Sequence, residues 1–295
     1  MGSFAGHLLP GMIFLIFSLY YSVLLSFALL RGQRFLKAPL PPKEKRGRRC
    51  WQVVPVEGVM KVVVTMTGIL PELFYPLGVN RMKMVDWEDP RRPFLFKDNW
   101  HHITMYGFFL VSGVVDIVSQ SCQARQNVRL ERAAESLAFC VVALLMASHL
   151  GNKSALEVRV HILFIVPTLL VSLALFVEIW VPDHPGVWVV KVWMGLVLSN
   201  WMLQLGVLMY VPPTGQPWRS ENPVDMAFVI LFFCWHLGLA AALMATIYGL
   251  CSLWHHRCSS WTEASEAKYQ LCPTAYSQEE LEKLQAEAEL LREGV

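Results

Sequence analysis

Histidines and carboxylates mark one end of the predicted membrane spans. His7, Glu72, His102, His149 and His161 come from five different apolar segments, each at the segment end that belongs to one side of the membrane. Neutral imidazole and carboxylate are usual nitrogen and oxygen ligands of Zn²⁺. Imidazole also titrates near neutral pH, so the same residues could hold and pass protons. The pattern predicts a cluster that binds a metal ion, with zinc as the candidate, or that handles protons.

The same histidines fit two other interpretations. Their spacing is not a recognised metal motif, because the chain has no HExxH and no CxxC. The amphipathic ring is also stable at a membrane interface, where its polar edge stays hydrated. A zinc-dependent hydrolase needs at least three protein ligands and an open position. Histidines from three segments could supply these ligands, although no HxxxH occurs on any of them.

Four further polar residues fall inside the predicted spans. Asn200 and Gln204 are four residues apart, so they share a helix face and can bond each other or a neighbouring helix. His236 lies near the middle of the last segment, where either amide would satisfy it. Asp116 lies roughly 21 Å along one helix from His102, near the opposite membrane face. Ionisable groups inside a span are functional-site candidates by default.

The elements that must position these residues are membrane-spanning helices. The 295 residues are 55% hydrophobic and 16% charged, with a mean hydropathy of +0.41, which is more apolar than the roughly 45–50% of soluble domains. Helices need roughly 20 apolar residues to cross the hydrocarbon. Seven segments qualify: 8–30, 53–76, 101–121, 133–151, 159–181, 187–211 and 225–254. In the second of these, Glu57 and Lys61 are expected to pair along the helix near the interface.

The distribution of basic residues predicts the orientation. With the N-terminus outside, twelve Lys or Arg lie on the inner side of the membrane and eight on the outer side. The bias favours an outer N-terminus and a cytoplasmic C-terminus. Basic residues segregated in this way indicate topology and argue against a nucleic-acid partner. The sequon at Asn152 falls outside in a loop so short that we expect no glycosylation there.

A polar tail follows the last span. We divide the chain into a transmembrane domain, 1–255, and a tail, 256–295. Within the tail, 277–292 opens with a capping-box pattern and carries apolar residues at heptad-like spacing. Two heptads are too short for a stable isolated helix, so this segment is expected to fold against a protein partner or the membrane. The predicted fold is an all-α integral membrane protein, a seven-transmembrane-helix bundle with a short polar C-terminal tail.

Several motifs follow one another along residues 1 to about 255: GHLLPG from Gly6, TGILPE from Thr67, WHHITMY from Trp100, GVVD from Gly113, QLG from Gln204 with Pro212 and Pro213, and FCWH from Phe233. In this order they resemble the transmembrane protein 45 family, and within it the transmembrane epididymal members. The resemblance implies a multi-pass protein of about seven helices in the secretory pathway or plasma membrane. It implies no biochemical activity. Relatives commonly carry His-x-His where this chain has His149, Leu150 and Gly151, which weakens a metal site.

Three functions compete on these observations. The first is a binding or transport protein in which the outer histidine and carboxylate cluster holds a metal ion or proton. The second is a structural or adaptor protein that recruits partners through its tail and does no chemistry. The third is a zinc-dependent intramembrane lipid hydrolase, and of the three it has the least support because HxxxH is missing.

Overall fold

The computed structural model describes residues 4–40, 55–79, 81–148, 150–151, 153–212 and 215–270, and these ranges contain seven α-helices. The chain divides into two compact units, residues 1–248 and 249–295. Within the described ranges the extended backbone is limited to a single bridge between Val85 and Phe94, so the predicted all-α class is confirmed. The helices are α1 Phe4–Leu30, α2 Val56–Phe74, α3 Lys97–Ile117, α4 Val128–Ser148, α5 Ala155–Glu178, α6 Pro185–Tyr210 and α7 Pro223–Gln270, with a π-helical turn, Val118–Cys122, continuing α3.

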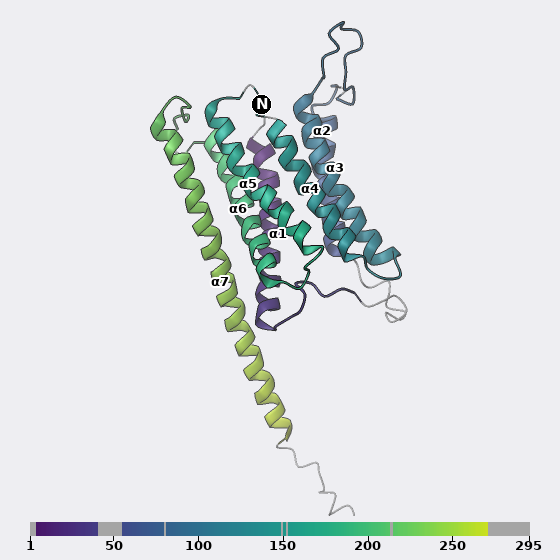
Figure 1. Ribbon diagram of the computed structural model, residues 1–295, viewed down its shortest axis with the longest axis vertical. Helices are drawn as coiled ribbons and strands as arrows, with labels where there is room; N and C mark the ends of the chain where they lie inside the picture. The colour runs from purple at the N-terminus through teal and green to yellow at the C-terminus, as the bar shows by residue number, and fades with distance from the viewer. Residues whose placement is uncertain are drawn as a thin grey trace, which may run out of the picture. The chain divides into compact units, whose positions relative to one another are not determined.

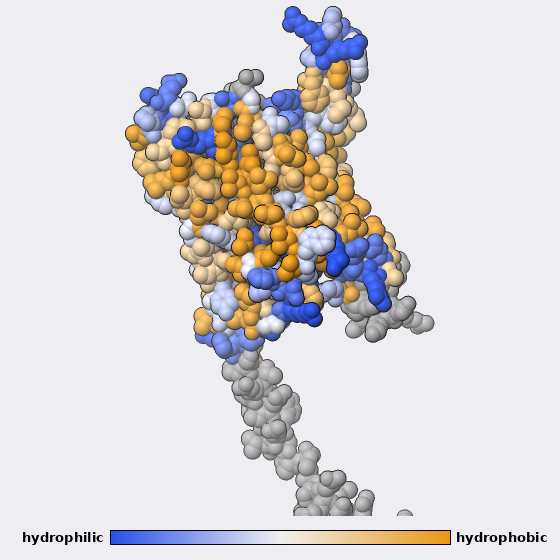
Figure 2. All heavy atoms as spheres, viewed as in Figure 1, coloured by the Kyte–Doolittle hydropathy of each residue, from blue (hydrophilic) through white to orange (hydrophobic). Residues whose placement is uncertain are grey.

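Five helical stretches of the described chain are long and apolar enough to cross a membrane: Gly6–Leu30, Lys97–Cys122, Ala155–Glu178, Pro185–Tyr210 and Pro223–Cys258. Helices α2 and α4 fall short of this criterion, since α2 carries Glu57, Lys61 and Glu72, and α4 carries several charged residues in its first two turns. On the face shown in Figure 2, hydrophobic residues form a broad belt with hydrophilic residues at its two ends. This distribution is typical of a helical membrane protein.

Most helices begin before the apolar segments that the sequence predicts. Helix α4 begins at Val128 and not at 133, because Glu131 and Arg132 are buried in the bundle and do not belong to a loop. Helix α5 begins at Ala155, where a capping box joins Ser154 and Glu157. Helix α7 continues past residue 255 to Gln270. The predicted tail helix, 277–292, lies outside the described residues.

The helices of the first unit pack in pairs, α1 against α6, α2 against α3 and α4 against α5 (Figure 1). The part of α7 in this unit, 223–248, contacts α6, where Trp193 Nε1 donates to the Leu237 carbonyl at 3.1 Å. Glycines set the closest approach. A Cβ atom on Gly58 of α2 or on Gly113 of α3 would lie 2.9 Å from the carbonyl oxygen of the other residue. Small residues of this kind let helix backbones touch within a membrane. Lys61 follows Gly58 by one turn, so this contact brings it near Asp116.

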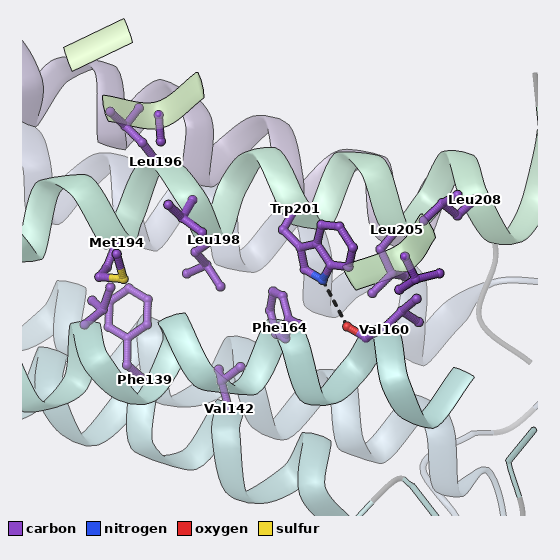
Figure 3. Close-up of a cluster of buried hydrophobic side chains, with 14 of the residues drawn as sticks. Phe139, Val142, Val160, Phe164, Met194, Leu196, Leu198, Trp201, Leu205 and Leu208 are labelled. Atoms are coloured by element: carbon purple, nitrogen blue, oxygen red, sulfur yellow. Dashed lines mark hydrogen bonds between the residues drawn. The ribbon is translucent and has the colours of Figure 1, made fainter. Parts of the chain in front are cut away.

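The main hydrophobic core joins α4, α5, α6 and α7 (Figure 3). Trp201 of α6 is fully buried at its centre, and its indole Nε1 donates to the Val160 carbonyl of α5 at 3.0 Å. A reciprocal pair supports the α4–α5 contact, since the Ser136 hydroxyl donates to the Ser172 carbonyl at 2.9 Å and the Ser172 hydroxyl donates to the Ser136 carbonyl at 2.8 Å. These bonds fix the depth at which the three helices meet.

Gly113→Ala should destabilise the protein, because the new Cβ would come within 2.9 Å of the Gly58 carbonyl oxygen and of Lys61 Cβ. Backbone must then move, at a typical cost of about 1–3 kcal/mol. The measurement is the unfolding temperature of detergent-purified protein. Gly107→Ala is the matched control on the same helix, since no atom lies within 4 Å of its Cβ position. Equal unfolding temperatures for the two variants would contradict the tight contact.

Candidate functional site

Lys61 of α2 lies at the centre of a buried group of charges. Its Nζ is 2.9 Å from Asp116 Oδ2 of α3, 3.4 Å from Glu135 Oε1 of α4 and 3.7 Å from Glu57 Oε1 on its own helix. The side chains of Lys61 and Asp116 are 9% and 5% exposed. The predicted Glu57–Lys61 pair is therefore present, but it is one part of a larger contact between three helices and not an isolated pair at the interface.

Arg132 of α4 extends this group toward α5 and α6. Its Nη1 donates to Glu135 Oε2 at 2.9 Å, and its Nε lies 3.3 Å from Glu178 Oε1 at the end of α5. Lys191 of α6 donates to the other oxygen of Glu178. Glu178 is thus held between two cations from neighbouring helices, and α4, α5 and α6 are joined at one depth.

Helix α1 and the segment after it complete the group. The Tyr21 hydroxyl of α1 donates to Glu57 Oε1, and Lys37 Nζ donates to Glu57 Oε2 at 2.8 Å. The Lys191 ammonium lies over the Tyr21 ring, 5.6 Å from its centroid, where the negative face of an aromatic ring attracts a cation. All six helices from α1 to α6 therefore contribute to this arrangement.

We call these residues the ion-pair network, and their formal charges balance. The network contains four cations and four carboxylates, namely Lys37, Lys61, Arg132, Lys191, Glu57, Asp116, Glu135 and Glu178. Burying an unpaired charge costs several kcal/mol, whereas paired charges largely offset that cost. Balance is thus a condition for burying seven of these charges in an apolar bundle, while Lys37 reaches Glu57 from the exposed segment after α1.

At the opposite end of the bundle the predicted histidines and carboxylates form two separate pairs. His102 Nδ1 of α3 lies 2.7 Å from Glu72 Oε1 of α2, and Asn99 donates to the other Glu72 oxygen. Glu72 is therefore hydrogen-bonded to two side chains near the start of α3, those of Asn99 and His102. The geometry fixes the His102 ring with its Nδ1 edge toward the carboxylate.

The second pair joins α1 and α5. The His7 ring lies 6.4 Å from the His161 ring and 5.3 Å from the Tyr210 ring, measured between centroids. His161 Nδ1 is 2.6 Å from the Glu157 carbonyl oxygen of its own helix. Within the described ranges no three His, Cys, Asp or Glu side chains gather closely enough to hold a metal ion. His149 and Asn152 lie outside those ranges, so the predicted metal site stays a prediction.

One cavity of about 200 Å³ extends between the two polar ends. His7, His102 and His161 line it at one end, and Lys61, Glu135 and Lys191 line it at the other. The wall between them is apolar and aromatic, and it includes Phe14, Phe109, Phe139, Phe164 and Met202. Helices α1 to α6 all contribute lining residues. The cavity is therefore amphiphilic along its length, with a charged end whose groups are already paired.

The remaining predicted polar residues are Asn200 and Gln204 on α6 and His236 on α7. His236 of α7 stacks edge-on against Trp201, with 5.7 Å between the ring centroids. In the described part of the chain, His236 Nδ1 and Asn200 Nδ2 are buried without a hydrogen-bond partner, and no hydrogen bond joins Asn200 to Gln204. These residues thus do not join the cavity or the ion-pair network.

Sequence reasoning missed four members of the network: Lys37, Arg132, Glu135 and Lys191. Arg132 lies just before the fourth apolar segment and was counted with the loop. Glu135 and Lys191 are single charges inside the apolar segments 133–151 and 187–211, and they were not predicted to form ion pairs. A usable signal was present, since Arg132 and Glu135 are three residues apart and share a helix face. A charged pair on one face of a span usually points into the bundle.

The comparisons with known proteins identify the family. Transmembrane epididymal protein 1 of Rattus norvegicus is 34% identical over 261 residues, which are 88% of this chain and 83% of the relative. The chain belongs to the transmembrane epididymal protein family. Transmembrane epididymal protein 1A of Mus musculus is 33% identical over 88% of this chain and 84% of its own length, and transmembrane epididymal protein 1 of Homo sapiens is 30% identical over 77% and 82%.

Residues 128–249 also match the profile of a family of unknown function (DUF716). That range begins at α4 and ends within α7, so it contains Arg132, Glu135, Glu178 and Lys191 of the ion-pair network. Membership of the transmembrane epididymal protein family agrees with the apolar helices in making this a membrane protein. The names of the relatives state no activity, so function must be argued from the geometry.

Proposed function

We propose that this transmembrane epididymal family member is a membrane protein that binds a small amphiphilic molecule in the cavity lined by the six helices α1 to α6. The observation that carries the proposal is the cavity itself, which runs from the histidines to the ion-pair network through an aromatic wall. Ligand sites are typically apolar cavities with a few placed polar groups. A polar head would meet Lys61, Glu135 and Lys191, and an apolar body would pack against the phenylalanines.

The ion-pair network supports this function by closing one end of the cavity. Its cations and carboxylates already satisfy one another across the five helices α2 to α6, so a bound head group would compete for existing bonds and would not have to neutralise a bare charge. Intramembrane charges that face a cavity often mark a substrate path. The histidine end, where Asp98, Lys153 and Glu157 also line the cavity, would form the entrance.

We also propose that all seven α-helices span the membrane, with the N-terminus outside and the C-terminus cytoplasmic. Support comes from the charges of α2 and α4, which are turned into the bundle and paired there, so that these helices need not present them to lipid. The excess of basic residues after α1 supports the orientation. A cysteine introduced at Trp87, between α2 and α3, should react with an impermeant thiol reagent from outside the cell; labelling only after permeabilisation would reverse the orientation.

Photolabelling tests the binding function directly. Purified full-length protein is irradiated with diazirine-bearing decanoic acid or decylamine, and the labelled residues are mapped by mass spectrometry. We expect label on Phe109, Phe139 and Phe164 of the cavity wall. Label confined to lipid-facing side chains such as Leu173 and Phe176, which are 56% and 53% exposed, would overturn the proposal.

Two tryptophan substitutions on α4 supply the control. Val142 is buried and lines the cavity, so Val142→Trp should fill it and reduce labelling of the cavity wall by at least about fivefold. Leu137 is 53% exposed on the lipid side of the same helix, so Leu137→Trp should leave that labelling unchanged. Equal labelling in the two variants would contradict binding in the cavity.

The earlier alternatives stay predictions. The adaptor function rests on the segment 277–292, which lies outside the described residues. The zinc hydrolase and the outer metal site both need a third ligand that the described residues do not bring to His102 or His161. Assignment to the transmembrane protein 45 family and to the secretory pathway or plasma membrane likewise stays a proposal, while the epididymal part of that resemblance agrees with the relatives.

A further inference from the structure

A second cavity, of about 180 Å³, lies beside the ion-pair network and shares Lys37, Arg132 and Glu178 with it. It is formed where the segment after α1 crosses the beginning of α4 and the end of α5. Phe35, Pro39 and Ile179 give it an apolar rim, and Lys37, Arg129 and Arg132 bring cations to it. It therefore combines a basic centre with an apolar rim, at a place that the proposed amphiphile site does not use.

The backbone that carries Lys37 is firmly positioned over this pocket. Leu36 is 4% exposed and packs against Trp188 and Val192 of α6. The Leu40 N–H donates to Gln126 Oε1, just before α4, at 2.8 Å. Contacts on both sides of Lys37 thus hold this segment against the bundle and fix its place in the pocket wall.

The pocket wall carries more positive than negative charge. Three cations line it, whereas Glu178 is its single carboxylate, and Glu178 is already bonded to Lys191 and paired with Arg132. Arg129 is exposed, and within the described ranges its side chain makes no ion pair or hydrogen bond. Partial burial lowers the pKa of Lys37, but the Glu57 carboxylate raises it to a value above the ordinary one, so Lys37 stays charged.

A second feature of the pocket favours an anion. Arg132 is 8% exposed, and its Nε makes no aligned hydrogen bond although Glu178 Oε1 lies 3.3 Å away. Helix α4 begins at Val128 in the same wall, which places the positive end of its dipole there. Guanidinium groups recognise phosphate through several donors at once. A phosphate would therefore find both charge and hydrogen-bond donors.

The depth of the pocket identifies the source of the phosphate. Two apolar spans, Gly6–Leu30 and Ala155–Glu178, end beside it, which is the level of the lipid head groups. Basic pockets between helices at that level bind anionic head groups. We propose that this pocket binds the phosphate of an anionic phospholipid, whose glycerol and acyl parts lie along Phe35 and Ile179.

Native mass spectrometry of the purified full-length protein tests this site. The protein is mixed with equal amounts of dioleoylphosphatidic acid and dioleoylphosphatidylcholine, and the ratio of the two complexes is measured. We expect the wild type to favour phosphatidic acid by at least about fivefold. Arg129→Gln should bring the ratio near one, because it removes an unpaired cation from the pocket without breaking an ion pair. A wild-type ratio near one would overturn the proposal.

Two further arms separate this site from general charge attraction. Arg125 is exposed near Arg129 but does not line the pocket, so Arg125→Gln should keep the wild-type ratio. An equal loss in both variants would overturn the pocket. Inorganic phosphate in millimolar excess should leave the phosphatidic acid complex intact, whereas its displacement would make a free phosphate the ligand and overturn the lipid assignment. Photolabelling of the central cavity does not depend on either result.

Discussion

Lys61→Met is expected to destabilise the protein strongly, because Lys61 is shared by Asp116, Glu135 and Glu57. Glu135 retains Arg132, and Glu57 retains Lys37. Asp116 retains no cation, since within the described residues its ion pair is with Lys61 alone. Leaving a buried charge without its partner typically costs about 3–5 kcal/mol. The free energy of unfolding, measured by denaturant titration in detergent, should fall by about that amount.

Two further variants separate this effect from a general loss of packing. In Lys61→Met/Asp116→Asn the uncompensated charge is gone, so we expect the double variant to be more stable than Lys61→Met. Asp116→Asn alone should cost less than Lys61→Met, because Lys61 keeps Glu57 and Glu135. If Lys61→Met and the double variant unfold at the same denaturant concentration, the charge argument fails, whatever the size of the loss.

Trp201→Ala is expected to have the second large effect. The Trp201 side chain is 0% exposed, packs edge-on against Phe233 at 5.1 Å and donates to the Val160 carbonyl. Removing a buried tryptophan leaves a large cavity and typically costs about 3–5 kcal/mol. Dispersion contacts with α5 and α7 are lost together, so the unfolding free energy in detergent should fall by several kcal/mol. The measurement is the same denaturant titration.

Two control variants separate the contribution of the Trp201 hydrogen bond from the effect of burying its ring. Trp201→Phe keeps most of the ring and loses the N–H donor, so it should cost about 1 kcal/mol for the bond and less in total than Trp201→Ala. Trp235 is 57% exposed on α7, and Trp235→Ala should change stability by about 0.5 kcal/mol or less. Equal losses at positions 201 and 235 would show that burial is not the cause.

The sequence predicted the elements well because apolar length is a local property. Its seven apolar segments correspond one to one with the seven α-helices of the described residues, and the all-α class follows from the need to satisfy backbone groups in lipid. Their beginnings were placed a few residues late at α3, α4 and α5 because hydropathy falls at the first charged residue. The number of spans that cross the membrane is not decided by this correspondence, since α2 and α4 are less apolar.

The site was less predictable than the helices. From the residue types and the side of the membrane, the sequence predicted that His7, His102 and His161 lie at the same end of the bundle. All three line one cavity. Whether they converge depends on which helices are neighbours, and hydropathy carries no such information. Packing of α2 on α3 and of α1 on α6 separates the Glu72–His102 pair from the His7–His161 pair.

The sequence by itself determined the apolar helices, the segregation of basic residues and the polar groups inside the spans, because each depends on residues close together in the chain. Tertiary structure alone decided the partners of those groups. Lys61 and Glu135 are 74 residues apart in sequence, and Arg132 and Glu178 are 46 apart, yet each pair lies within salt-bridge distance. Buried charges need opposite charges nearby, and only the packing of the five helices α2 to α6 brings those partners to the same depth.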